Sequence, residues 1–172
     1  MEFRKTQIED VEEILEIIDD AKAYLKSKGI DQWQNGYPNK DVILEDIKLG
    51  YSYVLLDDNK VIATAAISFD GEITYNKILD GNWLSDEDSN NKYAVIHRIA
   101  VAKQYRGHGI SSILIHDIEN LCKDYDIKSI RVDTHKENTS MQNLLKKHNF
   151  KYCGWIYLLD KSMRNAYEKL VE

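Results

Sequence analysis

The residue types and spacings that suggest chemistry gather in one stretch of the chain. Residues 91–116 include no acid, in a protein whose formal net charge is -6, and they carry four bases, Lys92, Arg98, Lys103 and Arg106. Residues 104–111 of this stretch read QYRGHGIS, after an expected strand and at the start of an expected helix. Glycines let a backbone turn tightly with its N–H groups inward, and a helix N-terminus adds about half a positive charge. The segment therefore predicts a cradle for a phosphate-like anion, although an ordinary glycine-rich turn would have the same composition.

Two common phosphate motifs do not fit this loop. The G-x-x-x-x-G-K-[ST] loop of nucleoside triphosphatases is absent, and G-x-G-x-x-G fails because Ser112 stands at the third glycine position. Nucleoside triphosphate and dinucleotide ligands are both disfavoured.

The elements that must position this loop follow from apolar periodicity and turn residues. Thr6 and Glu9 predict a capping box ahead of an amphipathic helix over residues 11–25. Helices are also expected over residues 40–49, 110–125 and 138–148, and strands over residues 2–5, 51–56, 61–69, 93–101, 129–134, 150–158 and 166–171. This order predicts an α/β (α+β) layered fold with a mixed sheet.

Residues 70–90 differ from the rest of the chain. They hold six acids against one base, Lys77, with Tyr75 and Trp83 between them. We interpret them as a loop or a loosely structured insertion.

Length and composition limit the alternatives. A chain of 172 residues with 43% apolar content is expected to form a single domain over residues 1–172. The acidic balance disfavours nucleic-acid and membrane partners, and no apolar run approaches the roughly 20 residues of a membrane span, so a cytoplasmic protein is expected. Cys122 and Cys153 lie far apart and outside any C-x-x-C pattern, which predicts neither a disulfide framework nor a metal site.

Two motifs together resemble those of the GCN5-related N-acetyltransferase (GNAT) family. Gln104, Gly107 and Gly109 match its acyl-CoA motif Q/R-x-x-G-x-G/A after the strand HRIAV. Downstream, residues 138–150 resemble the helix motif N-x-x-A-x-x-L-Y-x-x-x-G-F. The resemblance covers residues 93–158 well and is weaker towards both ends.

This resemblance implies a GNAT-like, mixed and mostly antiparallel twisted sheet, with splayed central strands flanked by helices. Acetyl-CoA would be the co-substrate, with pantetheine lying along Ile99, Ala100 and Val101. Residues 106–111 would hold the pyrophosphate: Arg106, Gly107, His108, Gly109, Ile110 and Ser111. Asn138 would contact the cofactor near its reactive end.

The sequence departs from the family pattern at two positions. Asn149 replaces the glycine before Phe150, and asparagine also tolerates the left-handed conformation that ends a helix. Leu145 stands where the family often has a tyrosine that protonates the leaving thiolate. Another donor, such as Tyr157 or water, would then be needed, or acid catalysis matters little.

Acetyl transfer to an amine requires the neutral amine, which is about one in 2,500 lysine-like amines at pH 7. His97 shares strand parity with Ile99 and Val101, so its ring is expected to face the thioester and to act as a base. The alternative is a half-buried strand histidine bonded to backbone. His135, at the end of the next strand, is the second candidate, and a solvent-facing role is its alternative.

The acceptor side is assigned to Trp33, Tyr37, Tyr75 and Trp83 together with the acidic residues 70–90. Aromatic rings and carboxylates attract a cationic amine. The alternative is a solvated surface loop with Trp83 packed as a plug.

The sequence as a whole predicts an acetyl-CoA-dependent N-acetyltransferase acting on a small-molecule or peptide amine by direct attack. Cys153 has no evident activating partner for an acyl-enzyme route. A non-catalytic acyl-CoA sensor, a transferase for protein N-termini or lysines, and a homodimeric state remain open.

Overall fold

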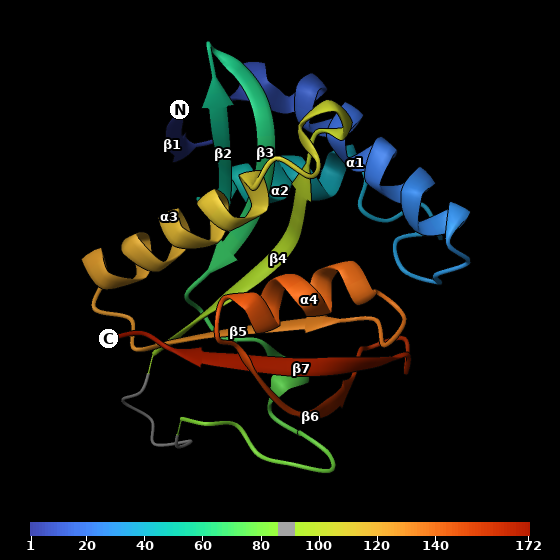
Figure 1. Ribbon diagram of the computed structural model, residues 1–172, viewed down its shortest axis with the longest axis vertical. Helices are drawn as coiled ribbons and strands as arrows, with labels where there is room; N and C mark the ends of the chain where they lie inside the picture. The colour runs from blue at the N-terminus through green and yellow to red at the C-terminus, as the bar shows by residue number, and fades with distance from the viewer. Residues whose placement is uncertain (86–91) are drawn as a thin grey trace. The chain divides into compact units, whose positions relative to one another are not determined.

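A computed structural model describes residues 1–85 and 92–172, and Figure 1 shows its helices and strands. The strands are β1 (Glu2–Lys5), β2 (Ser52–Asp57), β3 (Lys60–Ser68), β4 (Tyr93–Val101), β5 (Ser129–Thr134), β6 (Lys151–Tyr157) and β7 (Met163–Leu170). The α-helices are α1 (Val11–Ser27), α2 (Lys40–Lys48), α3 (Ile110–Asp124) and α4 (Thr139–Lys147). Short 3-10 turns are η1 (Ile8–Asp10), η2 (Ile73–Tyr75) and η3 (Lys103–Tyr105).

The sheet has the strand order β1-β2-β3-β4-β5-β7-β6. The pairs β1/β2, β2/β3, β5/β7 and β6/β7 are antiparallel, whereas β4 and β5 are parallel. The predicted fold class, a mixed and mostly antiparallel sheet flanked by helices, is therefore confirmed. The parallel ladder joins Tyr93–Val95 to Ser129–Arg131, so it is short, as the expected splay of these strands requires.

The chain divides into two compact units, each made of two separate stretches. The first unit contains Met1–Ile67 and His97–Asp117, and the second contains Ser68–Ile96 and Ile118–Glu172. Strand β4 and helix α3 each contribute residues to both units. The single-domain organisation of the chain stays a prediction.

The core of the first unit lies where α1 and α2 pack against strands. The buried cluster includes Ile14 and Ile18 of α1, Ile43 of α2, Val54 of β2 and Ala100 of β4. Burial of the isoleucine and valine side chains contributes about 1.5–3 kcal/mol each. The apolar spacing of α1 and α2 therefore predicted correctly which faces are inside.

The start of α1 differs from the prediction. Thr6 belongs to the β1–β2 pairing, because its hydroxyl lies 2.7 Å from that of Ser52 and its amide donates to the Ser52 carbonyl. The amide of Gln7 donates to the Asp10 carboxylate instead, at 2.7 Å. The capping box is one residue later than the proposed Thr6 and Glu9, because the β1 ladder has already engaged Thr6.

The described part of the acidic segment is a loop, as one of the two interpretations had it, but it is ordered against the rest of the second unit, so the alternative of a loosely structured insertion is wrong for residues 70–85. The amide and carbonyl of Leu79 both bond Trp155 of β6 (2.8 and 3.0 Å). Tyr75 is buried in a core cluster with Val95, Ile156 and Ala166. This stretch covers the β6 edge of the sheet, a site where unpaired strands are prone to association. Asp86, Glu87 and Asp88 lie outside the described residues.

Local turn chemistry agrees with the sequence at two further junctions, whereas β7 begins at Met163, three residues before the expected start. Asp58 and Asn59 have φ values of 46° and 63° at the β2–β3 turn, as expected for a tight hairpin. Asn149 has a φ of 64° after α4, which confirms the predicted left-handed helix end. Among residues 1–85 and 92–172, no helix combines the length and apolar character needed to cross a bilayer.

Candidate active site

The glycine-containing loop of the first unit presents backbone amides. Gly107 and Gly109 both have a φ of 78°, which favours glycine, and a side chain at either position would meet open space. The η3 turn closes before them, and the α3 bonds begin with the amides of Ser112 and Ile113 donating to Gly109. Within the described chain, the amides of residues 107–111 have no backbone acceptor. Five successive donors at a helix N-terminus can bind an anion.

The side chains of Arg106 and His108 contact groups of the first unit that lie near the loop. Arg106 donates from Nε to the Val101 carbonyl (3.2 Å), and its guanidinium lies 5.5 Å from the ring centre of Tyr24. His108 Nδ1 lies 3.0 Å from the Arg106 carbonyl oxygen. Gln104 and His108 are exposed. The Arg106 side chain thus lies along Val101 and Tyr24 of its own unit.

Strand β4 is irregular beside the candidate base. Arg98 has a φ of 51°, a left-handed conformation that costs a side-chain-bearing residue about 1–2 kcal/mol. Ile99 and Val101 are half-buried and flank the buried Ala100, so they share one face. The parity argument for His97 fails, because the left-handed residue at Arg98 interrupts the period of two between His97 and Ile99. His97 itself is half-buried.

Arg98 is bound to an acid from a distant part of the sequence. Its Nε and Nη2 donate to the two carboxylate oxygens of Asp46 in α2 at 2.7 and 2.6 Å, and Nη1 donates to the Tyr37 hydroxyl at 2.6 Å. The side chains of Arg98 and Asp46 are only 13% and 8% exposed. Burial opposes the charge on Arg98, but Tyr37 and Asp46 outweigh it and raise the guanidinium pKa. The charge of Arg98 is thus matched within the protein and is not available to an anionic ligand.

The loop before α2 holds two of the predicted acceptor residues in different settings. Trp33 packs against the core of the first unit. Tyr37 is 43% exposed while its hydroxyl accepts from Arg98. Gln34 Nε2 donates to the carbonyl of Gln32 at 2.9 Å, and Lys22 Nζ donates to the carbonyl of Pro38. Trp33 is explained by packing, and Tyr37 remains accessible.

The end of β5 places His135 and Asn138 at the start of α4. The amide of Glu137 donates to His135 Nδ1 at 3.1 Å, so in this arrangement Nδ1 acts as the acceptor and the proton of the neutral ring is on Nε2. Asn138 Oδ1 accepts from the Met141 amide at 3.1 Å and caps α4. A base role of His135 at Nδ1 is disfavoured by this geometry.

Tyr75 and Trp83 are held by packing and hydrogen bonds. Tyr75 is 1% exposed and donates to the Asp133 carboxylate at 2.7 Å, while Trp83 Nε1 donates to the Tyr75 carbonyl at 2.9 Å. Burial and the neighbouring Asp133 raise the Tyr75 pKa well above its usual value, and burial also raises the pKa of Asp133. A ring this enclosed is not available to stack on an acceptor, so we withdraw Tyr75 from the acceptor set.

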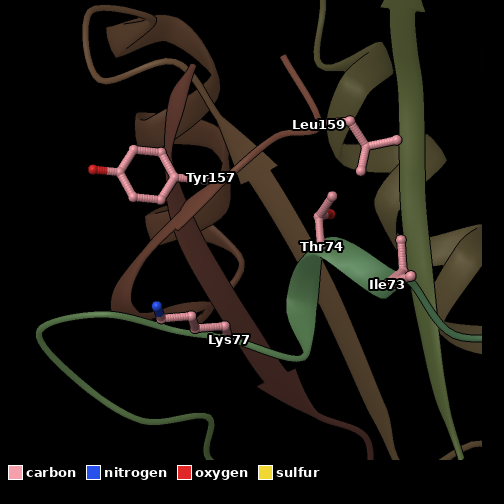
Figure 2. Close-up of a pocket in the computed structure, with 5 residues that line it drawn as sticks. All are labelled: Ile73, Thr74, Lys77, Tyr157 and Leu159. Atoms are coloured by element: carbon pink, nitrogen blue, oxygen red, sulfur yellow. The ribbon is translucent and has the colours of Figure 1, made fainter. Parts of the chain in front are cut away.

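A shallow pocket of about 200 Å³ lies on the second unit (Figure 2). It is lined by Ile73, Thr74, Lys77, Tyr157 and Leu159. Figure 2 shows Lys77 and Tyr157 on one side of Thr74, and Ile73 and Leu159 on the other. Tyr157 also packs edge-on against Trp155, with ring centres 5.0 Å apart. The charged member of this lining is basic, whereas the sequence favoured carboxylates on the acceptor side.

Sequence reasoning missed the acids that pair with buried arginines. Asp46 lies three residues after Ile43 in α2, a position on the apolar face of the helix, and this spacing could have marked it. Glu168 of β7 is fully buried and accepts from Arg131 Nε at 3.0 Å. No comparable pattern in the sequence pairs Glu168 with Arg131.

Cys153 is a buried free thiol. Burial raises the pKa of its thiol to about 11, with a further contribution from Glu168. The thiolate is therefore scarce at neutral pH. In the part of the chain that the structure describes, no group of three or more His, Cys, Asp or Glu side chains could hold a metal ion.

Known proteins resemble this chain over nearly its whole length. The family described as acetyltransferase (GNAT) family matches residues 13–150. A crystal structure of a GNAT-family acetyltransferase from Streptococcus agalactiae 2603 is 34% identical, with a TM-score of 0.89 over 99% of this chain and 95% of that one. The uncharacterized N-acetyltransferase YesJ of Bacillus subtilis (strain 168) is 20% identical over 94% of this chain and 85% of its own length. Ard1 from Thermoplasma volcanium, 17% identical with a TM-score of 0.73 over 99% of this chain and 97% of its own, shares the fold.

Proposed function

On the premise that the chain belongs to the acetyltransferase (GNAT) family, we propose that it moves the acetyl group of acetyl-CoA to a primary amine of a small molecule or peptide. Family membership supports acetyl transfer as the type of reaction. The choice of acetyl-CoA and of the amine is the proposal.

The observation that carries the proposal is the loop at residues 107–111. Its amides have no backbone acceptor within the described chain, and Gly107 and Gly109 hold left-handed turns with open space beside them. A pyrophosphate is the part of acetyl-CoA that matches several N–H donors at a helix N-terminus. Ile99 and Val101, on one face of β4, would then accompany the pantetheine.

The reaction we propose has no covalent enzyme intermediate. The neutral amine nitrogen attacks the thioester carbonyl carbon, the C–N bond forms, and the C–S bond breaks to release the CoA thiolate. The amine proton passes to a base, for which His97 is the candidate, and the thiolate takes a proton from water or Tyr157. Leu145 is fully buried in α4 and has no proton to donate.

Within the second unit, we propose that the pocket lined by Lys77 and Tyr157 is a separate subsite that binds a substituent of the acceptor. Its apolar residues, Ile73 and Leu159, would cover a short aliphatic group, and the Lys77 ammonium would attract an acidic one. Acceptors that combine an amine with a carboxylate are therefore the first to test.

Leu145 also favours a second candidate, a non-catalytic acyl-CoA sensor. A panel of amines with and without carboxylates, assayed by thiol release from acetyl-CoA, separates the two functions. Turnover with any amine, retained in Cys153→Ala, supports direct transfer. Tight acetyl-CoA binding without turnover on the whole panel overturns the transferase proposal in favour of the sensor.

The base can be tested separately through its pH dependence. His97→Ala is expected to lower the rate most below pH 8, with partial recovery at higher pH, where more of the amine is neutral. A deficit that is equal at every pH would assign His97 a packing role.

A further inference from the structure

The backbone of β4 turns left-handed at a residue for which this conformation is unfavourable. Arg98 has a φ of 51° and lies between His97 and Ile99, the candidate base and a candidate pantetheine contact. A side chain in this region persists only where its surroundings hold it. The contacts of Arg98 must therefore supply the restraint on its backbone.

Two side chains of the first unit, Asp46 of α2 and Tyr37 of the preceding loop, bind the guanidinium through three hydrogen bonds. Asp46 takes Nε and Nη2 in a two-point contact at 2.7 and 2.6 Å, and the Tyr37 hydroxyl takes Nη1 at 2.6 Å. Asp46 is itself fixed, because it lies between Ile43 and Ile47, which pack in the core, and its carbonyl accepts from the Tyr51 amide at 2.8 Å. The restraint on Arg98 thus extends back to a helix that is packed in the core.

The burial of this contact separates it from an ordinary surface ion pair. Both charged side chains are more than four-fifths enclosed, and the two-point geometry fixes the orientation of the guanidinium plane. Every nitrogen of Arg98 has a partner, so the side chain has no donor group left wholly unengaged for a phosphate. The contacts of Arg98 can instead restrain the backbone of β4.

We propose that Tyr37, Arg98 and Asp46 form a latch that holds the left-handed turn of β4 and so sets the directions in which His97 and Ile99 face the acetyl group. These three are positioning residues, and the inference rests on the proposed acetyl transfer. Without the latch, Arg98 is expected to relax to an extended conformation. A one-residue change in the alternation of a strand moves the following side chains to the other face.

Two substitutions at residue 98 distinguish a backbone role from a side-chain role. Arg98→Ala and Arg98→Gly both remove the latch, but glycine adopts a positive φ without strain and alanine does not. We expect Arg98→Ala to lower kcat by tenfold or more, and Arg98→Gly to be at least threefold faster than Arg98→Ala. Acetyl-CoA affinity, which the residue 107–111 loop dominates, should change by less than threefold in both.

The Arg4–Asp10 pair supplies a matched control in the same unit. Arg4 binds both carboxylate oxygens of Asp10 at 2.8 and 3.0 Å, and the side chains are 23% and 9% exposed. Asp46→Asn and Asp10→Asn should both lower thermal stability. Only Asp46→Asn should lower kcat by tenfold or more, and Tyr37→Phe should lower it two- to fivefold.

Amide hydrogen exchange over residues 97–101 measures how firmly the backbone is held, and it requires no catalysis. Exchange should be faster in Arg98→Ala than in Arg98→Gly. Equal kcat and equal exchange in these two variants would overturn the latch, as would an Asp46→Asn variant with unchanged kcat. If the native protein acetylated no amine, the proposed function would fail, while the exchange measurement would still decide whether the latch exists.

Discussion

Two buried arginine–carboxylate pairs, Arg98–Asp46 in the first unit and Arg131–Glu168 in the second, differ in what surrounds them. Arg98–Asp46 adds the hydroxyl of Tyr37, on a partly exposed loop, and holds an irregular strand. Arg131–Glu168 is enclosed, with side chains 6% and 0% exposed. Arg131 lies between the rings of Trp83 and Tyr93, 4.3 and 4.0 Å from their centres.

The surroundings of Glu168 explain its role. Besides Arg131, it accepts from the hydroxyls of Ser85 and Ser129 and from the amides of Leu84 and Ser85. These donors join residues 84–85 to β5 and β7. A carboxylate with this many partners fixes a fold, whereas a pair that ends at the hydroxyl of a partly exposed tyrosine can position the side chains of β4. The same two residue types thus serve different ends, according to what else they bind.

The largest effect should come from breaking the enclosed pair. Glu168→Gln is expected to lower the free energy of unfolding by about 3–5 kcal/mol, because it leaves Arg131 buried without a counter-charge. Urea unfolding measures the change. Glu12→Gln is the control: Glu12 pairs with Lys40 at the surface, with side chains 76% and 56% exposed, and its loss should cost less than about 1 kcal/mol. Equal losses in the two variants would remove the distinction between enclosed and exposed pairs.

The contact between residues 79–81 and β6 gives the next largest effect. A methyl group at Gly81 would collide with the backbone carbonyl of Cys153, which cannot move without disturbing β6. Gly81→Ala is therefore expected to cost about 1–3 kcal/mol in urea unfolding. Asn76→Ala, at an exposed position of the same segment, should stay within about 0.5 kcal/mol. A neutral Gly81→Ala would mean that this segment does not lie tightly against the strand.

Local chemistry made most of the fold predictable. Strand β5 over Ser129–Thr134 and the β2–β3 hairpin follow from alternation and from the turn residues Asp58 and Asn59. The order of residues 70–85 did not follow, because their acidic composition is typical of loops while the contacts that order them come from β6 and β7. Partners distant in sequence decided the outcome there.

The same limit applied to the candidate site. The glycine loop was predicted, since its spacing alone specifies the turn. The direction of His97 was not, because one left-handed residue at Arg98 cancels a parity argument, and that residue is held by Asp46 from 52 positions away. Short-range patterns predict backbones that are regular and miss those that distant side chains distort.

In the first unit, a substitution in the glycine loop should affect acetyl-CoA binding more than it affects stability. Gly107→Ala is expected to cost about 1 kcal/mol in stability, because φ is 78° and no neighbour is close. Acetyl-CoA affinity should fall about tenfold, since the loop must turn back to present its amides. Calorimetric titration measures the affinity. Gly36→Ala, with a φ of 72° and open surroundings in the loop before α2, should carry the same strain without the loss of affinity.

Acid titration gives the smallest effect and the sharpest contrast between the two pairs. Burial disfavours the charged form of Glu168, but hydrogen bonds from Ser129, Ser85 and Arg131 outweigh it and lower its pKa below 4.5. Burial raises the pKa of Asp46 above 3.8 in spite of Arg98. The stability that Glu168 contributes is full above pH 4.5 and is lost as pH falls through its native pKa, whereas the native state of Asp46 binds its proton more tightly than the unfolded chain.

The two carboxylates should therefore respond to acid in opposite directions. As pH falls from 7 towards 4, the stability difference between native protein and Asp46→Asn should grow, because protonation favours the folded state at Asp46. The corresponding difference for Glu168→Gln should hold steady and then shrink below pH 4.5. Urea unfolding of the three proteins at half-unit pH steps measures both slopes. If the two stability differences changed with pH in the same direction, the hydrogen bonds of the Asp46 carboxylate would stabilise its charge as those of Glu168 do. Arg98 would then be held as firmly as Arg131.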